Sequence, residues 1–154
     1  MILKMVRWFA EKLQCRRITG EDGSLYLERY KVFGWMPGDK RKWPVSIYLH
    51  RFARPDNDPA PHCHPWAWAI SLILTGGYAE ERLVNGETRE VERGPLSLAL
   101  LRSNTFHNVA ELRGETWTLF IVGPKTKSWG FMVPGRGYVP WRDRLRERGI
   151  EPSY

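Results

Sequence analysis

The stretch of sequence that decides the fold is residues 61–77, which read PHCHPWAWAISLILTGG. Its central part, residues 66–74, is almost wholly apolar, and it is preceded by a proline and followed by two glycines. A short apolar run between residues that favour turns is typical of a strand buried in a core. The glycines also permit a sharp bend into the next segment. We therefore predict a core strand here, entered from a proline-rich loop.

Two histidines lie two positions apart directly before this strand. Side chains at positions i and i+2 of an extended segment project to the same side, so His62 and His64 can converge on one point. Cys63 projects to the opposite side, and we do not expect it to bind the same ion. Neutral imidazole nitrogens suit iron, zinc, nickel and copper. The pattern predicts a divalent metal site, and the alternative is a pair of loop histidines that hold no metal.

Short strands and turns continue on both sides of this stretch. Asn85-Gly86 is a strong signal for a tight hairpin, and residues 54–61 contain three prolines and must form a loop. Turn signals that recur roughly every eight to twelve residues favour an all-β sandwich or closed barrel of antiparallel strands. We expect strands at residues 15–19, 25–33, 45–53, 66–74, 78–84, 87–92, 96–101, 106–112, 116–122 and 129–133, a turn at 20–23, and helices at 2–14 and 141–148.

Length and composition fit one globular domain that spans residues 1–154. Of these residues, 42% are hydrophobic and 27% are charged. No apolar run is long enough to cross a membrane, and residues 1–13 lack the features of a secretion signal. Two cysteines, Cys15 and Cys63, are too few for a disulfide framework. We therefore expect reduced thiols and a cytoplasmic protein.

The formal net charge of +7 raises the question of a nucleic-acid partner. The excess is spread along the chain, and its densest stretch, residues 136–148, contains arginines that alternate with acidic residues. Such alternation is typical of a solvated helix face. We therefore expect a small-molecule partner rather than nucleic acid or a membrane, and the sequence leaves a homodimer open.

A third histidine, His107, lies at the head of another predicted strand. With it the pattern resembles the cupin superfamily, whose first motif has His-x-His, then Glu, then Gly, and whose second has a His after a Pro-x-Gly turn. His62 and His64 match the first pair, Gly76 falls at the final glycine, and His107 matches the second motif's histidine. The resemblance covers roughly residues 45–122. It implies a cupin-type antiparallel β-barrel, a double-sheet jelly roll with short terminal helices and one metal ion on the three histidines.

The sequence departs from the family pattern at the fourth ligand. The glutamate of the first motif would fall at Trp68 or Ala69, the Pro-x-Gly turn is replaced at residues 102–104, and the second motif's asparagine would fall at Glu111. A site of three histidines resembles the thiol-dioxygenase branch of cupins, which holds Fe(II) and leaves positions open for substrate and O₂. Zinc, nickel and manganese are the alternative ions. A neutral ligand set leaves the charge of the ion uncompensated, so we expect an anionic substrate such as a carboxylate or thiolate.

Four further residues are candidates for contacts with a substrate. His50, on the strand before the metal loop, and Tyr78, on the strand after it, are the catalytic candidates, although a structural role fits His50 equally well. Tyr78 shares one face of its strand with Glu80. Arg51 and Arg102 are candidates for clamping a substrate carboxylate by paired hydrogen bonds, against the ordinary alternative of exposed arginines.

The function predicted from these residues is that of a mononuclear non-haem iron oxygenase acting on a small anionic substrate. A metal-independent enzyme of the sugar-nucleotide epimerase kind is an alternative, but it would need a histidine base with an aspartate partner, and Asp56 and Asp58 lie in a loop. A non-catalytic module that binds a small ligand is a third interpretation. Metal analysis separates the first two, and a turnover assay separates the third.

Overall fold

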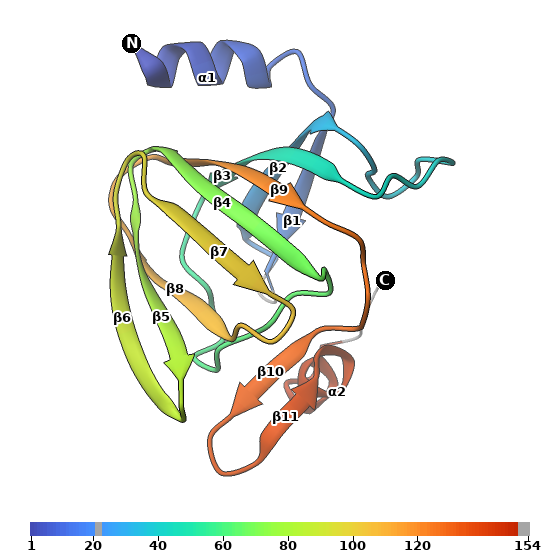
Figure 1. Cartoon of the computed structure of the whole chain (residues 1–154), viewed down its shortest axis with the longest axis vertical. Coiled ribbons are helices and arrows are strands. Elements are labelled where there is room, and N and C mark those ends of the chain that lie inside the picture. Colours follow the sequence, from blue (N-terminus) through green and yellow to red (C-terminus); the bar gives the residue numbers. More distant parts are fainter. Residues whose placement is uncertain (21–22, 151–154) are drawn as a thin grey trace.

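The computed structural model of the chain describes residues 1–20 and 23–150. Within these residues antiparallel strands dominate, and a short helix lies near each end (Figure 1). In chain order the elements are α1 (Ile2–Ala10), β1 (Cys15–Thr19), β2 (Leu25–Phe33), β3 (Ser46–Phe52), β4 (Trp68–Thr75), β5 (Tyr78–Val84), β6 (Glu87–Arg93), β7 (Leu98–Arg102), β8 (His107–Leu112), β9 (Thr116–Val122), β10 (Gly130–Val133), β11 (Gly137–Pro140) and α2 (Trp141–Glu147). The turn expected at residues 20–23 includes two positions outside the described residues.

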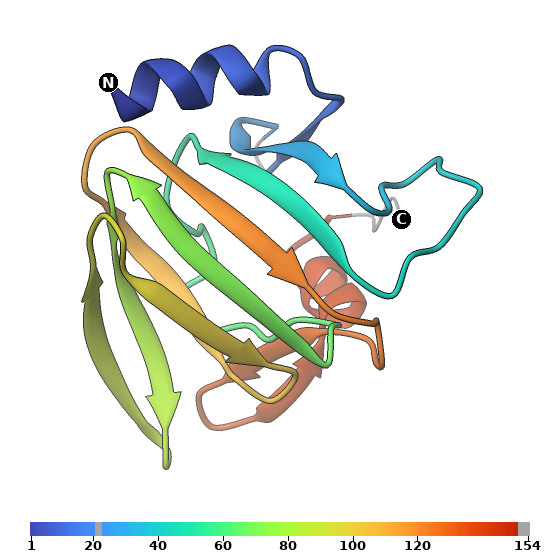
Figure 2. The same cartoon turned by 45° about the horizontal axis from the view of Figure 1, so that its top comes forward.

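The strands form two layers. The larger sheet has the order β1-β2-β3-β9-β4-β7, and the smaller has the order β6-β5-β8. In Figure 2 the larger sheet is seen face-on, with β5, β6 and β8 folded to one side of it. The backbone N–H of His62 donates to the His107 carbonyl at 2.9 Å, and the N–H of Cys63 donates to the Gly130 carbonyl at 2.9 Å. Residues 61–63 therefore connect the smaller sheet to the hairpin of β10 and β11.

The alternation of side chains along the strands separates an interior from an outer face. In β3, Tyr48 and His50 are buried in the interior. Leu49 points to the outer face, where Ala10 of α1 and Trp117 of β9 pack against it. The apolar residues of α1 recur at helical spacing, so one side of this helix is covered by the sheet. α1 thus covers one part of the outer face, while the interior lies between the two layers.

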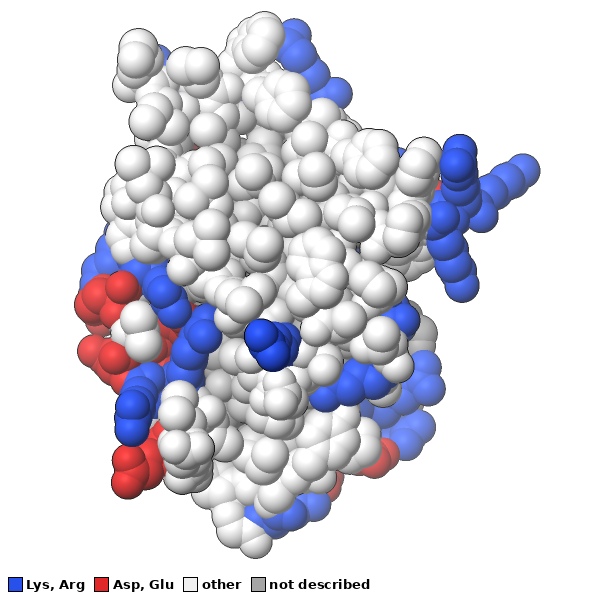
Figure 3. All heavy atoms as spheres, viewed as in Figure 1, with Lys and Arg blue, Asp and Glu red and all other residues white. Residues whose placement is uncertain are grey.

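Beyond α1, the outer face of the larger sheet is apolar and partly exposed. Ile47, Ile121, Ile70 and Leu100 are successive cross-strand partners in one row over β3, β9, β4 and β7. Leu100 is 46% exposed and its neighbour Leu98 is 57% exposed. Figure 3 shows few charged side chains in the middle of this view, and most of them lie around its edges. An apolar surface of this kind is suited to contact with another apolar surface.

The predicted fold class is confirmed, and the differences are shifts at the element boundaries and one strand, β11, that was not predicted. α1 ends at Ala10 because the N–H groups of Lys12 and Leu13 bond three residues back, to Phe9 and Ala10, in a tighter turn. β11 was not predicted, because it is short and begins at a glycine, a residue typical of turns; Gly137 indeed has a turn conformation, with a φ of +81°. No helix in the described part of the chain is long and apolar enough to cross a membrane.

Candidate metal centre

Three histidines from two separate segments meet in the interior. His62 and His64 follow the loop of residues 54–61, and His107 is the first residue of β8. Each offers one ring nitrogen, and the three nitrogens lie within 4.8 Å of one another. We call these residues the histidine cluster. The fully buried Cys63 is not part of it, so the structure brings together the three residues predicted as metal ligands without the cysteine between two of them.

Backbone pairing explains why the histidines meet. His62 and His107 lie directly opposite each other in an antiparallel bridge, where each donates its N–H to the carbonyl of the other at 2.9 and 3.0 Å. Directly opposed residues project to the same face of a sheet. His64 lies two positions further along and projects to that face as well. The meeting therefore depends on the 61–63 segment joining β8 as a short strand.

The cluster fits a divalent metal ion. Imidazole nitrogens about 2.1 Å from a shared ion lie about 3.0 to 3.4 Å from each other. The Nε2 atoms of His64 and His107 are 2.8 Å apart, and the whole set lies within 4.8 Å, so small ring rotations suffice. Burial lowers the pKa of His62 to about 4 and holds the pKa of His64 well below its ordinary value. Both rings are therefore neutral at neutral pH, the form that binds a metal.

A buried carboxylate orients the third histidine. Glu80 of β5 is fully buried, and its Oε1 lies 2.8 Å from His107 Nδ1 while its Oε2 accepts a hydrogen bond from Arg93 Nε at 2.8 Å. The Nε of Arg82 lies 3.0 Å from Glu80 Oε1. Burial raises the pKa of Glu80, but the hydrogen bond to His107 and the two guanidinium groups lower it to about 2. An ionised Glu80 holds the proton of His107 on Nδ1 and leaves Nε2 for the cluster.

The two catalytic candidates both face the interior. His50 stacks on Phe120 with ring centres 4.7 Å apart, and Phe120 lies 6.1 Å from the ring of His64. Burial, and then the charge of a nearby arginine, hold the pKa of His50 well below its ordinary value. Tyr78 is buried beside Phe52 at 5.8 Å, and burial raises the pKa of its phenol. At neutral pH His50 is therefore uncharged and Tyr78 keeps its proton.

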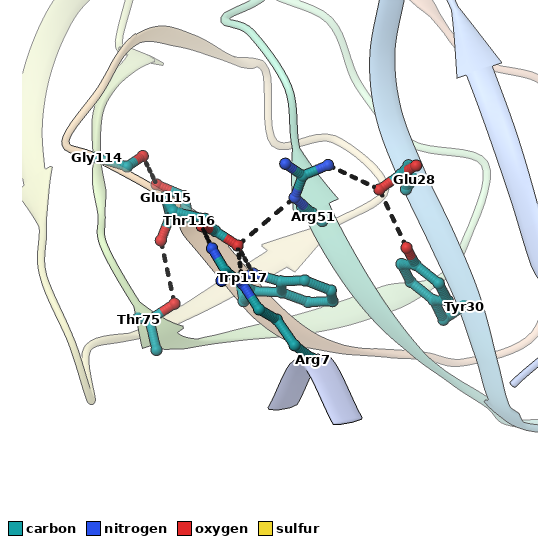
Figure 4. A network of polar contacts seen from close by, with 9 residues as sticks. All are labelled: Arg7, Glu28, Tyr30, Arg51, Thr75, Gly114, Glu115, Thr116 and Trp117. Carbon is teal, nitrogen blue, oxygen red and sulfur yellow. Dashed lines mark hydrogen bonds and ion pairs between the residues drawn. The ribbon is translucent and has the colours of Figure 1, made fainter. Parts of the chain in front are cut away.

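Arg51 and Arg102 are not brought to the histidine cluster. Arg51 points to the outer face, where it forms ion pairs with Glu28 at 3.0 Å and Glu115 at 3.6 Å. Figure 4 shows these groups in one polar network, in which Arg7 of α1 also contacts Glu115. They line a cavity of about 210 Å³ between α1 and the sheet. Arg102 is exposed at the end of β7.

Sequence reasoning missed two residues of this interior. The partnership of Glu80 with His107 was not predicted, although the shared face of Glu80 and Tyr78 was the signal that pointed to it. Arg29 of β2 lies directly opposite His50, and its Nε donates to His50 Nε2 at 2.9 Å. Alternation along β2 places Arg29 on the same face as the apolar Leu27, and this was the signal in the sequence that Arg29 faces the interior. The signal is weak because an arginine side chain is usually exposed.

No family model matches the chain, and no curated protein matches it. Solved structures resemble it in fold. Fe(II)-HppE with the substrate (S)-1-HPP has a TM-score of 0.53 and 10% identity, over 74% of this chain and 57% of its own. A variant of Streptomyces PAC13 with uridine has a TM-score of 0.54 and 10% identity, over 80% of this chain and 88% of its own. A cupin superfamily protein from Desulfitobacterium hafniense has a TM-score of 0.50 and 14% identity, over 76% of this chain and 88% of its own.

These likenesses concern the fold alone, because the sequence identities are low. The chain spans just over half of the length of HppE. Two antiparallel layers around the histidine cluster agree with the cupin fold of these structures. The chain has the cupin fold, which confirms the resemblance drawn from His62, His64 and His107.

Proposed function

We propose that the protein is a mononuclear non-haem iron oxygenase that acts on a small anionic substrate. The observation that carries this proposal is the histidine cluster, which brings three imidazole nitrogens within 4.8 Å of one another and, among the described residues, includes no carboxylate. When bound, an Fe(II) ion supplies redox chemistry with O₂, provided that positions on it stay open. HppE, a protein of similar fold, was crystallised with Fe(II), which supports iron over zinc, nickel or manganese.

The chain's own residues would orient the cluster and exclude water from it. Glu80 fixes the Nδ1 proton of His107, so the Nε2 lone pair of that ring stays available. Trp66 stacks on His64 at 5.5 Å, and Phe120 packs against both rings. Apolar walls of this kind strengthen electrostatic interactions inside a site because they displace water.

His50 and Tyr78 would contact the substrate from the same interior. The phenol of Tyr78 keeps its proton at neutral pH, since burial raises its pKa, and it can donate a hydrogen bond. His50 is neutral, and the hydrogen bond from Arg29 to its Nε2 leaves the ring proton on Nδ1. A set of three histidine ligands without a carboxylate would leave the charge of a bound cation uncompensated, and this favours an anionic ligand.

The test is an oxygen-uptake assay on protein purified without added metal and then loaded with Fe(II) or with Zn(II). A panel of thiols, diketones and small carboxylates serves as substrates. We expect O₂ consumption with the Fe(II) form, only when a substrate is present, and none with zinc, which has no accessible redox change. Cys63→Ser is the matched control and should retain activity, because Cys63 is outside the cluster. Equal turnover with zinc would contradict the oxygenase and indicate hydrolysis or isomerisation.

A metal-independent enzyme of the sugar-nucleotide epimerase kind is the second candidate. Two observations favour it: the direct contact of His64 with His107 at 2.8 Å, and the uridine bound to PAC13, which has a similar fold. Turnover of a nucleotide sugar by protein stripped with a chelator would support this function over the first.

A non-catalytic module that binds a small ligand is the third candidate. The aromatic packing of His50, Phe120 and Phe52 in the interior favours it, because well-packed rings leave less room for chemistry. Saturable ligand binding without turnover in every metal form would support it.

A further inference from the structure

Arg29 places a positive charge in the interior among aromatic rings. It lies on β2 directly opposite His50, and its Nε donates to His50 Nε2 at 2.9 Å. Its guanidinium carbon is 5.1 Å from the centre of the Tyr48 ring and 5.9 Å from that of the Trp66 ring. The side chain is half-buried. Arg29 is thus fixed by a neutral partner and by two aromatic faces.

No carboxylate pairs with Arg29 in the described part of the chain, where its hydrogen bond goes to an imidazole. The other arginines that are held deep in the structure differ. Arg82 and Arg93 share Glu80, and Arg144 pairs with Asp58 at 2.9 Å. A charge that is partly removed from water without a counter-ion is costly. Burial lowers the pKa of Arg29, and the positive charge of Arg16 also acts to lower it.

The terminal nitrogens of Arg29 are available to a ligand. The hydrogen bond to His50 uses Nε, and the described residues provide no hydrogen bond to Nη1 or Nη2. Neither atom is among the polar atoms that are both fully buried and unpaired, so solvent reaches them. These two groups form a planar fork that matches two oxygens of a carboxylate or phosphonate.

The fork lies close to the histidine cluster. Trp66, which is 5.9 Å from the guanidinium carbon, stacks on His64 with ring centres 5.5 Å apart. Arg29 is therefore no farther from the His64 ring than the sum of these two distances. A small molecule held by its anionic end at Arg29 would need to extend past one indole ring to reach the cluster.

We propose that Arg29 binds the anionic end of the substrate through two oxygens of a carboxylate or phosphonate, and that His50 holds the guanidinium in position. The assignment of this anion as substrate rests on the proposed function, whereas binding of the anion itself requires no metal. Arg29 takes the part that the sequence alone suggested for Arg51 or Arg102. In binding the anionic end, His50 acts through Arg29 and is a positioning residue, while the rest of its ring stays available to the remainder of the substrate.

Isothermal titration calorimetry tests this assignment on the intact protein, prepared metal-free and Zn(II)-loaded. The probes are propionate, propylphosphonate and the uncharged methyl propionate. The wild type should bind at least one of the two anions and not the ester, and the stronger of them identifies the anionic group. Arg29→Gln should weaken anion binding by about tenfold or more. Arg29→Lys keeps the charge but loses the fork, so its affinity should be intermediate. Arg89→Gln, an exposed arginine on β6, makes the same charge change and should leave binding unaltered.

The role of His50 is tested in the same titrations. In His50→Gln the amide oxygen can still accept from Arg29, so the anion affinity should stay near that of the wild type, whereas His50→Leu should lower it. Denaturant unfolding of both variants separates this effect from a loss of stability. Equal anion affinity in the two variants would overturn the positioning role.

Three results would overturn the assignment of Arg29. They are the absence of saturable anion binding to the wild type, anion binding that is unchanged in Arg29→Gln and Arg29→Lys, and equal binding of the ester. Should Arg29→Gln fail to fold, Arg29→Lys decides. The outcome is separable from the proposed function. If the protein binds anions but no metal, the iron-oxygenase proposal is refuted and the assignment of Arg29 stands. If it binds metal but no anion, only the assignment of Arg29 is refuted.

Discussion

The substitution Glu80→Gln isolates the contact that orients His107. Glutamine has nearly the same shape as glutamate but carries no charge, so the substitution leaves no cavity. It removes the negative charge that faces His107 at 2.8 Å, Arg93 at 2.8 Å and Arg82 at 3.0 Å. The two guanidinium groups are only 16% and 20% exposed, so they lose a counter-ion that water replaces poorly.

The expected cost follows from the burial and from the pKa of Glu80. A pKa lowered from an ordinary value of 4.5 to about 2 corresponds to about 3 kcal/mol of stabilisation of the charged form. Removal of one partner from a buried ion pair costs about 3 to 5 kcal/mol, in agreement with the value obtained from the pKa of Glu80. For a chain of this length, 3 kcal/mol lowers the unfolding temperature by about 6 to 12 °C. Metal affinity should also fall, by about 10- to 100-fold, because His107 loses the group that fixes its tautomer.

Urea unfolding of the metal-free protein measures the first effect, and competition with a chromophoric chelator measures the second. Glu81→Gln is the matched control, because Glu81 is the neighbouring residue on β5 and alternation turns it away from the face of Glu80. We expect this control to change stability by less than about 0.5 kcal/mol. A Glu80→Gln variant with the stability and metal affinity of the wild type would refute the orienting role of Glu80.

Three further predictions follow from other parts of the fold. Replacement of any one residue of the histidine cluster by Ala should lower metal occupancy sharply, since two imidazoles hold a divalent ion weakly; full occupancy in all three variants would remove the assignment. Hydrogen bonds from Arg7 and a tryptophan lower the pKa of Glu115 to about 2, so this anchor of α1 is intact above pH 4.5 and lost as the pH falls toward 2. The protection factors of the amides in α1, which are corrected for the pH dependence of intrinsic exchange, should fall over that window in the wild type and be low throughout in Glu115→Gln. The homodimer that the sequence leaves open would use the apolar outer face; in that case the wild type sediments as a dimer and Leu100→Lys as a monomer, and a monomeric wild type would contradict it.

The positions of the strands along the chain and the shared side of the histidine pair could be predicted from the sequence because they depend on local patterns. The apolar run before Gly76-Gly77 predicted β4, and the His-x-His spacing predicted that His62 and His64 share a side. Both inferences use the period-two alternation of an extended chain, which is a property of the backbone. Predicting the third histidine of the cluster, His107, needed the resemblance to cupins, since nothing local connects it to residues that lie over forty positions earlier.

The remaining parts of the site depend on pairing between distant strands. Arg29 becomes a partner of His50 through the register of β2 and β3, and a shift by one residue would place it on the outer face. The same alternation sends Arg51 outward, a signal that was present in the apolar Ile47 and Leu49 beside it. A single domain over residues 1–154 and a cytoplasmic location stay predictions.

X-ray absorption spectroscopy of the protein purified without added metal tests the central claim, that one divalent ion binds to His62, His64 and His107. We predict an iron edge with a first shell of nitrogen and oxygen alone, and multiple scattering that fits three imidazole rings. The Ala variant of His64 should lose this pattern. A sulfur shell at about 2.3 Å would place Cys63 on the ion, and such a shell, or a wild-type protein without bound metal, would contradict the account.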